Sequence, residues 1–373
     1  MTTRSFCLLG LLAGLVLAIP LAQACAPAPR FNESVSIDTE TALIIWDPQT
    51  KVQHFIRGAS FRSSSADFGF LVPTPTKPEL AEATTAPFLA MEHMTAPRTE
   101  IQTVDPPIGC PFGINAKSTF MAGAAAPSSP PVQVLEQKRV GGYDAAVLKA
   151  EDPQALLTWL KENGYDARPQ LLEWLKVYTS QKWIVTAFKI AADKASTNGP
   201  VTLNSSPVRM TFPTERPFFP YREPADQRLG DPRLAAPRSL KVYLLAEGRM
   251  RGKLGDDSQL WPGQTLWANP LTAQQVSEIT RPLKLTEAQT AVMAGRTWWL
   301  TEFDDRSSPR PGIDEVYFDQ SSNQATVERP PNIKTVYREY PLWAALTASM
   351  LGPLILVAIL AWVTRKLMRP KAQ

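Results

Sequence analysis

Two tyrosines and one carboxylate form the group of residues in this sequence that best suits ligand binding. Tyr143 and Asp144 follow the pair Gly141-Gly142 at the start of an expected strand, and Tyr165 follows Asn163-Gly164 at the end of an expected helix. Placed close together, these phenol and carboxylate groups would line a binding groove. The alternative is structural: the glycines make a turn, Asp144 accepts a backbone N–H, and the tyrosines pack.

No other group of side chains has the spacing of a catalytic or metal site. His54 and His93 are the two histidines, and no His-x-x-x-His, Cys-x-x-Cys, Gly-x-Ser-x-Gly or phosphate-binding glycine motif occurs, so we expect no metal and no cofactor. We interpret His54 as a packed or surface histidine. The acidic pairs Asp304-Asp305 and Asp314-Glu315 are expected in solvated loops, although paired carboxylates can also perform acid–base chemistry.

The three cysteines leave one possible pair in the mature chain. Cys7 lies within an expected signal peptide, so Cys25 and Cys110 remain. In an oxidising compartment we expect these two to form a disulfide, with Cα atoms about 4.4–6.8 Å apart. Two alternatives stay open: two unrelated thiols, or acylation of Cys25 as in a lipoprotein, a pattern that Gln23 fits poorly.

The two ends of the chain predict export and membrane attachment. Arg4, an apolar run over 6–19 and Ala22-Gln23-Ala24 are typical of a signal peptide, residues 1–24. The uncharged apolar stretch 342–363 would rise about 33 Å as a helix, enough to cross the hydrocarbon core. The basic tail 364–373 indicates that the C-terminus is cytoplasmic. We therefore predict a bacterial inner-membrane protein whose main domain is extracytoplasmic, or periplasmic.

Small residues recur along the expected membrane helix. Ala344, Ala348 and Gly352 are spaced four residues apart, so they would share one helix face. In lipid, such a face lets two helices approach closely. We interpret it as a helix-packing surface for a second copy or for another membrane protein; the alternative is that the helix only anchors.

The region between the two ends, residues 25–340, predicts an α+β domain. Thr41–Trp46 and Lys51–Arg57 surround the turn Asp47–Thr50 and predict a hairpin. Helices are expected over 78–94, and as two pairs. The first pair comprises 152–163 and 169–178, and the second comprises 272–280 and 286–294. Asp152-Pro153 is typical of a helix start, and Thr286 with Gln289 has the spacing of a capping box.

This pattern predicts a fold class of α+β, with a mostly antiparallel sheet, inserted helical pairs and one C-terminal transmembrane helix. A proline- and alanine-rich loop near 115–131 marks the break if the domain has two subdomains, and the proline-rich stretch 207–237 is expected to be extended. The net charge of +4 comes from the two ends of the chain, so the main domain is close to neutral and we expect no nucleic-acid partner.

Three stretches resemble a bacterial family that carries the domain of unknown function 2330: Phe68–Leu80, Val140–Leu148 and Asp152–Tyr165. The resemblance covers most of the main domain. It implies an exported and often membrane-tethered protein, and it supplies no catalytic residue.

Taken together, the sequence favours a membrane-tethered, non-enzymatic binding or scaffolding component of the cell envelope, with another envelope protein or a second copy as its partner. The alternative is a periplasmic hydrolase that uses carboxylates on an envelope polymer, which two or more carboxylates in one concave pocket would favour. A third possibility, an uptake component for a small solute, requires a deep apolar pocket.

Overall fold

The computed structural model describes residues 27–28, 35–63, 69–104, 133–165, 167–190, 201–204, 206–225, 239–256, 259–307, 310–337, 355 and 357–366. The chain divides into two compact units. The first comprises residues 1–96 and 118–329, and the second comprises residues 97–117 and 330–373.

Within its described residues, the first unit contains a five-stranded antiparallel sheet in the order β1-β4-β9-β8-β7. This order places β8 between β7, its hairpin partner, and β9, which follows two helices further along the chain. The strands are β1 Pro27–Ala28, β4 Gly69–Thr74, β9 Ile184–Ile190, β8 Tyr143–Lys149 and β7 Gln133–Val140.

A larger sheet of eight strands has the order β16-β17-β13-β2-β3-β11-β5, and β10 also pairs with β3. Its pairs are antiparallel except for β2 with β13, which is parallel. The strands are β16 Gln264–Pro270, β17 Trp299–Asp305, β13 Ser239–Ala246, β2 Val35–Asp47, β3 Val52–Ser63, β11 Val208–Pro213, β5 Glu79–Glu82 and β10 Val201–Asn204.

A four-stranded sheet, in the order β12-β18-β14-β15, completes the strands of this unit that the structure describes. One buried core takes side chains from all three sheets, because alternate residues of each strand point to the same side. Tyr143 and Val147 enter this core from β8, and Ile44 enters it from β2. The four strands are β12 Phe218–Phe219, β18 Val316–Gln320, β14 Met250–Leu254 and β15 Gln259–Leu260.

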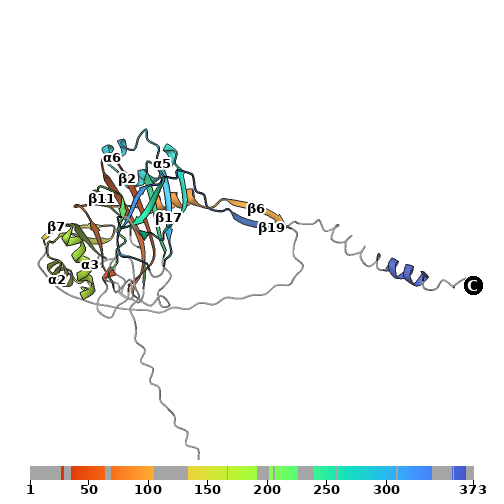
Figure 1. Ribbon diagram of the computed structural model, residues 1–373, viewed down its shortest axis with the longest axis horizontal. Helices are drawn as coiled ribbons and strands as arrows, with labels where there is room; N and C mark the ends of the chain where they lie inside the picture. The colour runs from red at the N-terminus through yellow and green to blue at the C-terminus, as the bar shows by residue number, and fades with distance from the viewer. Residues whose placement is uncertain are drawn as a thin grey trace, which may run out of the picture. The chain divides into compact units, whose positions relative to one another are not determined.

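Helices cover the other face of the two larger sheets (Figure 1). On the five-stranded sheet, α2 (Pro153–Glu162) and α3 (Pro169–Ser180) pack on the residues of β8 that alternate with the core residues, such as Ala146 and Leu148. On the eight-stranded sheet, α1 (Ala86–Thr95), α5 (Ala273–Thr280) and the 3-10 helix η2 (Arg281–Leu283) do the same. The short helix α6 (Glu287–Ala291) follows η2.

Charged side chains are also buried in this unit. The Arg57 Nε–H donates to Glu40 Oε1 at 2.6 Å, and Arg310 Nη1 lies 3.7 Å from Glu40 Oε2. Arg310 Nε lies 3.9 Å from Asp305 Oδ2, which also accepts a hydrogen bond from the Tyr221 hydroxyl at 2.6 Å. Each charge therefore has an opposite charge beside it, as burial requires.

The expectation that the acidic pairs lie in solvated loops is wrong for three of the four residues. Asp304, Asp305 and Glu315 are buried, because they end β17 or precede β18 and face partners there. Glu315 accepts hydrogen bonds from the Tyr178 hydroxyl at 2.5 Å and from the Tyr221 N–H at 2.7 Å.

The second unit contains a parallel pair of strands, β6 (Thr99–Val104) and β19 (Asn332–Tyr337). Ile101 and Ile333 are exposed on it. Within the described residues it is a two-stranded sheet.

The predicted C-terminal transmembrane helix, 342–363, is wrong as an element of the fold. Among the described residues, no helix has both the length and the apolar character needed to span a bilayer. Helical backbone is described at 355 and over 357–366. The fold class is therefore α+β without that helix.

Several other predictions fall outside the described residues. These are the signal peptide 1–24, the loop 115–131, most of the basic tail 364–373, the disulfide candidates Cys25 and Cys110, and the helix-packing candidates Ala344, Ala348 and Gly352.

Candidate binding site

The strand order of the five-stranded sheet places three charged residues in one row. Asp144 on β8 is directly opposite Arg139 on β7 and directly opposite Lys189 on β9. Residues opposite each other on neighbouring strands share a face of the sheet. The carboxylate therefore lies between two cations, on the face that α2 and α3 cover.

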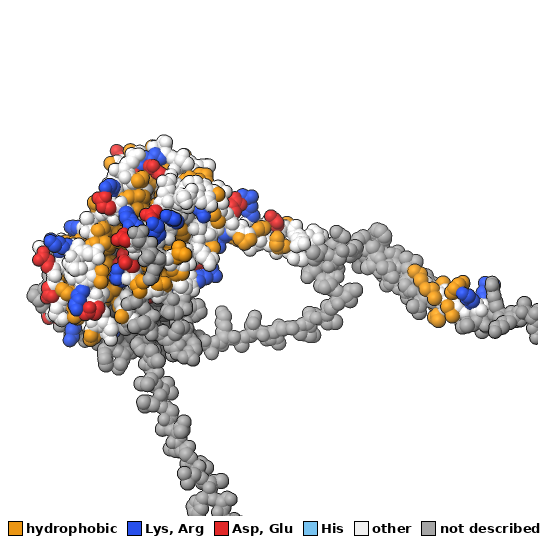
Figure 2. All heavy atoms as spheres, in the orientation of Figure 1, with side chains coloured by type: hydrophobic (Ala, Val, Ile, Leu, Met, Phe, Trp, Pro, Cys, Tyr) orange, Lys and Arg blue, Asp and Glu red, His pale blue; other side chains and the backbone are white. Residues whose placement is uncertain are grey.

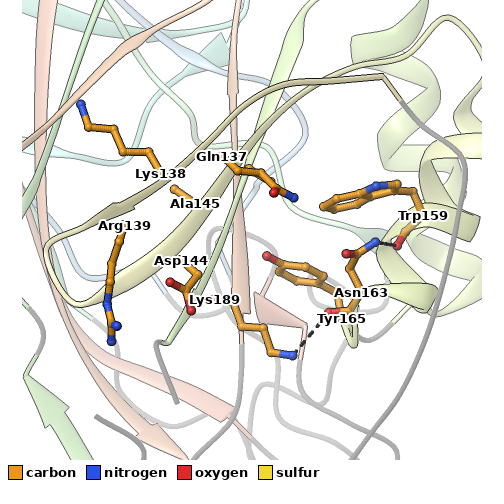
Figure 3. Close-up of a pocket in the computed structure, with 10 residues that line it drawn as sticks. Gln137, Lys138, Arg139, Asp144, Ala145, Trp159, Asn163, Tyr165 and Lys189 are labelled. Atoms are coloured by element: carbon orange, nitrogen blue, oxygen red, sulfur yellow. Dashed lines mark hydrogen bonds between the residues drawn. The ribbon is translucent and has the colours of Figure 1, made fainter. Parts of the chain in front are cut away.

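The two helices leave this end of the face open. They pack over Ala146 and Leu148, and beyond these residues lies a groove of about 390 Å³ (Figure 3). One wall is the sheet and the other is the end of α2 with the residues after it. The groove is lined by Gln137, Lys138, Arg139, Asp144, Ala145, Ala146, Trp159, Asn163, Tyr165 and Lys189.

The helix end that forms the second wall is fixed by hydrogen bonds. Gly164 has a φ of +76°, the left-handed conformation that commonly ends helices, and the Tyr165 N–H donates to the Leu160 carbonyl at 2.9 Å. The Asn163 side-chain amide donates to the Trp159 carbonyl at 2.9 Å, and Lys189 Nζ donates to the Asn163 carbonyl at 3.4 Å. Lys189 thus connects the sheet wall to the helix wall.

Two aromatic rings stand in the helix wall. Trp159 and Tyr165 are stacked, with ring centroids 6.2 Å apart and an interplanar angle of 28°. Both are largely buried, so their positions do not depend on a ligand. Figure 3 shows both rings directed from the helix side toward the space above Asp144 and Lys189.

The local charge of the groove is positive. Lys138, Arg139 and Lys189 outnumber the single carboxylate, Asp144. Lys138 Nζ donates to the Leu80 carbonyl at 2.7 Å, away from the row, so Arg139 and Lys189 are the cations that flank Asp144. Because Arg139 and Asp144 are exposed, a ligand can reach both.

Two of the three predicted binding residues meet in this groove. Asp144 and Tyr165 line it, whereas Tyr143 does not. Tyr143 precedes Asp144 on a strand and therefore points to the opposite face, where its ring packs edge-on against Phe70 at 5.2 Å and against Phe188 at 5.9 Å. Its structural interpretation is the one that holds.

The sequence-based prediction did not include Arg139, Trp159 and Lys189. Trp159 belongs to the apolar stripe of a predicted helix and gave no sign of lining a groove. Arg139 and Lys189 become neighbours of Asp144 only through strand register. Among the described residues, no group of three or more His, Cys, Asp or Glu side chains is placed to hold a metal ion.

The family model described as "Uncharacterized protein conserved in bacteria (DUF2330)" matches residues 19–310, which include every residue of the groove. No curated protein and no solved structure matches the chain.

Proposed function

The chain belongs to the DUF2330 family of bacterial proteins, and from the groove on its five-stranded sheet we propose that it is a non-enzymatic binding protein for an anionic ligand. The row of Arg139, Asp144 and Lys189 is the observation that carries this proposal.

The row suits a carboxylate-bearing ligand that also donates hydrogen bonds. The Arg139 guanidinium can bind a carboxylate with two parallel N–H donors, and the Lys189 ammonium adds a second positive charge. Asp144 between them accepts from ligand hydroxyl or ammonium groups. An acidic sugar carries this combination of groups, and the side-chain amides of Gln137 and Asn163 on the groove walls can contact its hydroxyls.

The positive charge that would attract an anionic ligand is local to the groove. On the face shown in Figure 2, basic and acidic side chains are interspersed over the folded body, so the view shows no extended surface of one sign. We therefore expect weak, salt-sensitive binding in which contacts within the groove select the ligand.

The alternative, a hydrolase with paired carboxylates, has less support. Such enzymes place two carboxyl groups about 5–9.5 Å apart around the bond that is cleaved. The groove is lined by one carboxylate. The buried carboxylates of Asp305 and Glu315 are hydrogen-bonded to the Tyr221 and Tyr178 hydroxyls, so they serve the fold.

Glucuronate and glucose test the proposal, because they differ in the carboxylate. We expect NMR titration of the full chain to show glucuronate binding in the millimolar range or tighter and glucose binding at least about fivefold more weakly. Arg139→Gln should remove the difference. Lys149→Gln, an exposed lysine at the other end of β8, is the matched control and should retain it. Equal binding of the two sugars, or none, would overturn the proposed ligand class.

We also propose that the folded domain acts outside the cytoplasm, because residues 1–24 have the pattern of a signal peptide. Alkaline phosphatase joined after Tyr337 should be active in cells, and deletion of residues 2–24 should abolish that activity. Activity without those residues would contradict the assignment.

A further inference from the structure

A second cavity, of about 360 Å³, lies on the helix-covered face of the eight-stranded sheet, beneath α6. Its volume is in the range of small-molecule sites. It is lined by Ile45, Asp47, Thr50, Val52, His54, Glu79, Thr211, Phe212, Pro213, Ala288, Gln289, Val292, Met293 and Trp298.

The floor of the cavity is one row of residues across four neighbouring strands. Ile45 on β2 is opposite His54 on β3, His54 is opposite Thr211 on β11, and Thr211 is opposite Glu79 on β5. The row becomes more polar toward the edge of the sheet. A ligand lying along it would meet an apolar side chain at one end and a carboxylate at the other.

The histidine in the row is uncharged at neutral pH. His54 is buried, and its Nδ1 lies 2.9 Å from Thr211 Oγ1. Burial and the nearby positive charge of Arg209 lower the pKa of His54 to about 4, although Asp47 acts in the opposite direction. His54 therefore offers hydrogen bonding and no positive charge.

The charged groups that line the cavity are carboxylates. Burial opposes ionisation of Asp47, but hydrogen bonds from Thr50, Arg296 and Gln49 outweigh it and hold the pKa of Asp47 below its usual range. Its oxygens are thus already satisfied by the turn and by Arg296.

Glu79 is the carboxylate that remains accessible. Its side chain is 60% exposed, and Arg209 Nη2 lies 3.5 Å away. Arg209 is buried on the same face of β11 as Thr211, and its Nη1 also donates to the Leu283 carbonyl at 3.0 Å, so η2 holds the guanidinium beside the row and it is not among the lining residues.

The walls and roof are mainly apolar. Val52 and Pro213 come from the strands, and Val292 and Met293 come from the segment after α6. The roof is held in place because the Trp298 indole N–H donates to the Met293 carbonyl at 2.9 Å and Thr286 with Gln289 forms a capping box on α6.

We propose that this cavity is a binding site for a small organic cation with an apolar body and an ammonium head. The body lies between Val52, Pro213 and Met293, and the head lies at the Glu79 end of the row. A carboxylate head would lose its hydration and would meet Glu79 with no cation in the lining, so the cavity rejects fatty acids. The site is separate from the groove on the five-stranded sheet and does not depend on the function proposed for that groove.

Three probes of equal chain length, octylamine, octanol and octanoate, test the site by NMR titration of the full chain at neutral pH. We expect octylamine to bind most tightly, octanol more weakly, and octanoate most weakly. Octanoate binding as tightly as octylamine would overturn the proposal.

A substitution at the mouth of the cavity tests the location. Ala288 is an exposed residue of α6 that lines the cavity, whereas Ala291 is an exposed residue of the same helix that does not. Ala288→Trp should weaken octylamine binding by about tenfold or more, and Ala291→Trp should leave it unchanged. Equal effects of the two substitutions would place the amine elsewhere.

A second pair of variants tests the head group. Glu79→Gln should weaken octylamine binding by about threefold and leave octanol binding unchanged, because it removes one partly exposed charge. Glu82→Gln, on the opposite face of β5, should change neither. Arg139→Gln, in the other groove, should also leave octylamine binding intact. An unchanged preference for the amine in Glu79→Gln would exclude Glu79 as the partner of the ammonium.

Discussion

At the scale of single residues, the ion pairs of this protein differ sharply in burial. Glu40 and Arg57 pair at 2.6 Å with side chains 0% and 5% exposed, whereas Lys51 and Glu215 pair with side chains 54% and 81% exposed. Solvent screens the second pair, and each of its members is well hydrated when alone. Loss of one member of the first pair leaves an uncompensated charge in the interior.

Glu40→Gln should therefore destabilise the protein by about 3–5 kcal/mol, since Arg57 and Arg310 would both lose their nearest carboxylate. Glu215→Gln should change the free energy of unfolding by less than about 1 kcal/mol. Urea unfolding at pH 7 measures both. Similar losses in the two variants would mean that the buried pair is hydrated in solution.

His54 should make stability depend on pH. Its pKa is about 4 in the folded protein and 6.5 in the unfolded chain, so the unfolded chain takes up the proton first as the pH falls. The stability is present above pH 6.5 and is lost as the pH falls to about 4, by about 3 kcal/mol for this one group.

His54→Gln, which keeps a polar neighbour for Thr211, should reduce the loss of stability between pH 7 and pH 4 by about that amount. Carboxylates titrate in the same range in both proteins, so the difference between the two unfolding curves isolates the histidine. Identical pH dependence would contradict burial of His54.

At the scale of single residues, the sequence predicts the positions that are set by neighbouring residues in the chain. Asp144 and Tyr165 are recognisable as groove residues, because a strand start and a helix end identify them. Tyr143 lies outside the groove because one step along a strand reverses the face. Lys189 was missed because its position beside Asp144 depends on pairing with β9, which follows α2 and α3 in the chain, whereas Arg139 was missed although it faces Asp144 across the short β7–β8 hairpin.

At the scale of secondary structure elements, a few capping side chains determine where helices begin. Asp152 accepts hydrogen bonds from the Gln154 and Ala155 N–H groups, at 3.0 and 2.9 Å, at the start of α2. Thr85 occupies the same position before α1 but makes no such side-chain bond. The groove wall at the far end of α2 depends on this helix.

Asp152→Ala should cost about 1 kcal/mol of stability, whereas Thr85→Ala should cost only a few tenths of that. Thermal unfolding of the two variants provides the comparison. Equal shifts would show that the carboxylate does not cap α2 in solution.

Local signals explain which elements the sequence predicts. The hairpin of β2 and β3, helices α2 and α3, and the capping box of α6 are confirmed, because turn residues and caps act over three or four positions. The helix expected over 78–94 is confirmed only in its second half, as α1, because Glu79–Glu82 pairs with β11 and Pro87 stands in the first turn of the helix.

The proline-rich stretch 207–237 likewise contains β11 and β12, whose strand character comes from partner strands elsewhere in the chain. The apolar run 342–363 has the length and composition of a membrane span, but no helix among the described residues is long and apolar enough to cross a bilayer.

At the scale of the whole molecule, the centre of the eight-stranded sheet joins distant parts of the sequence. β2 pairs in parallel with β13, in register from Thr39 with Ser239 to Ile45 with Leu245. The core residues of β2, such as Ile44, are covered only when later strands are in place. Pairings of such separation close late and slow the folding of a domain.

A fragment that ends at residue 225 should therefore not fold. It lacks β13, β16 and β17, so β2 would become an apolar edge strand. We expect this fragment, 27–225, to show no cooperative unfolding transition by circular dichroism and to bind a hydrophobic dye. A cooperative transition in the fragment alone would disprove the requirement for β13.

The same parallel pairing makes the molecule separable into two complementary pieces. When 27–225 is mixed with 239–337, β13 can insert beside β2 without a covalent connection, and the two pieces should recover the circular dichroism spectrum of the intact chain. If each piece were fused to half of a reporter enzyme, reassembly of the sheet would restore the reporter, and octylamine, which binds only the assembled cavity, would shift that reassembly to lower concentrations.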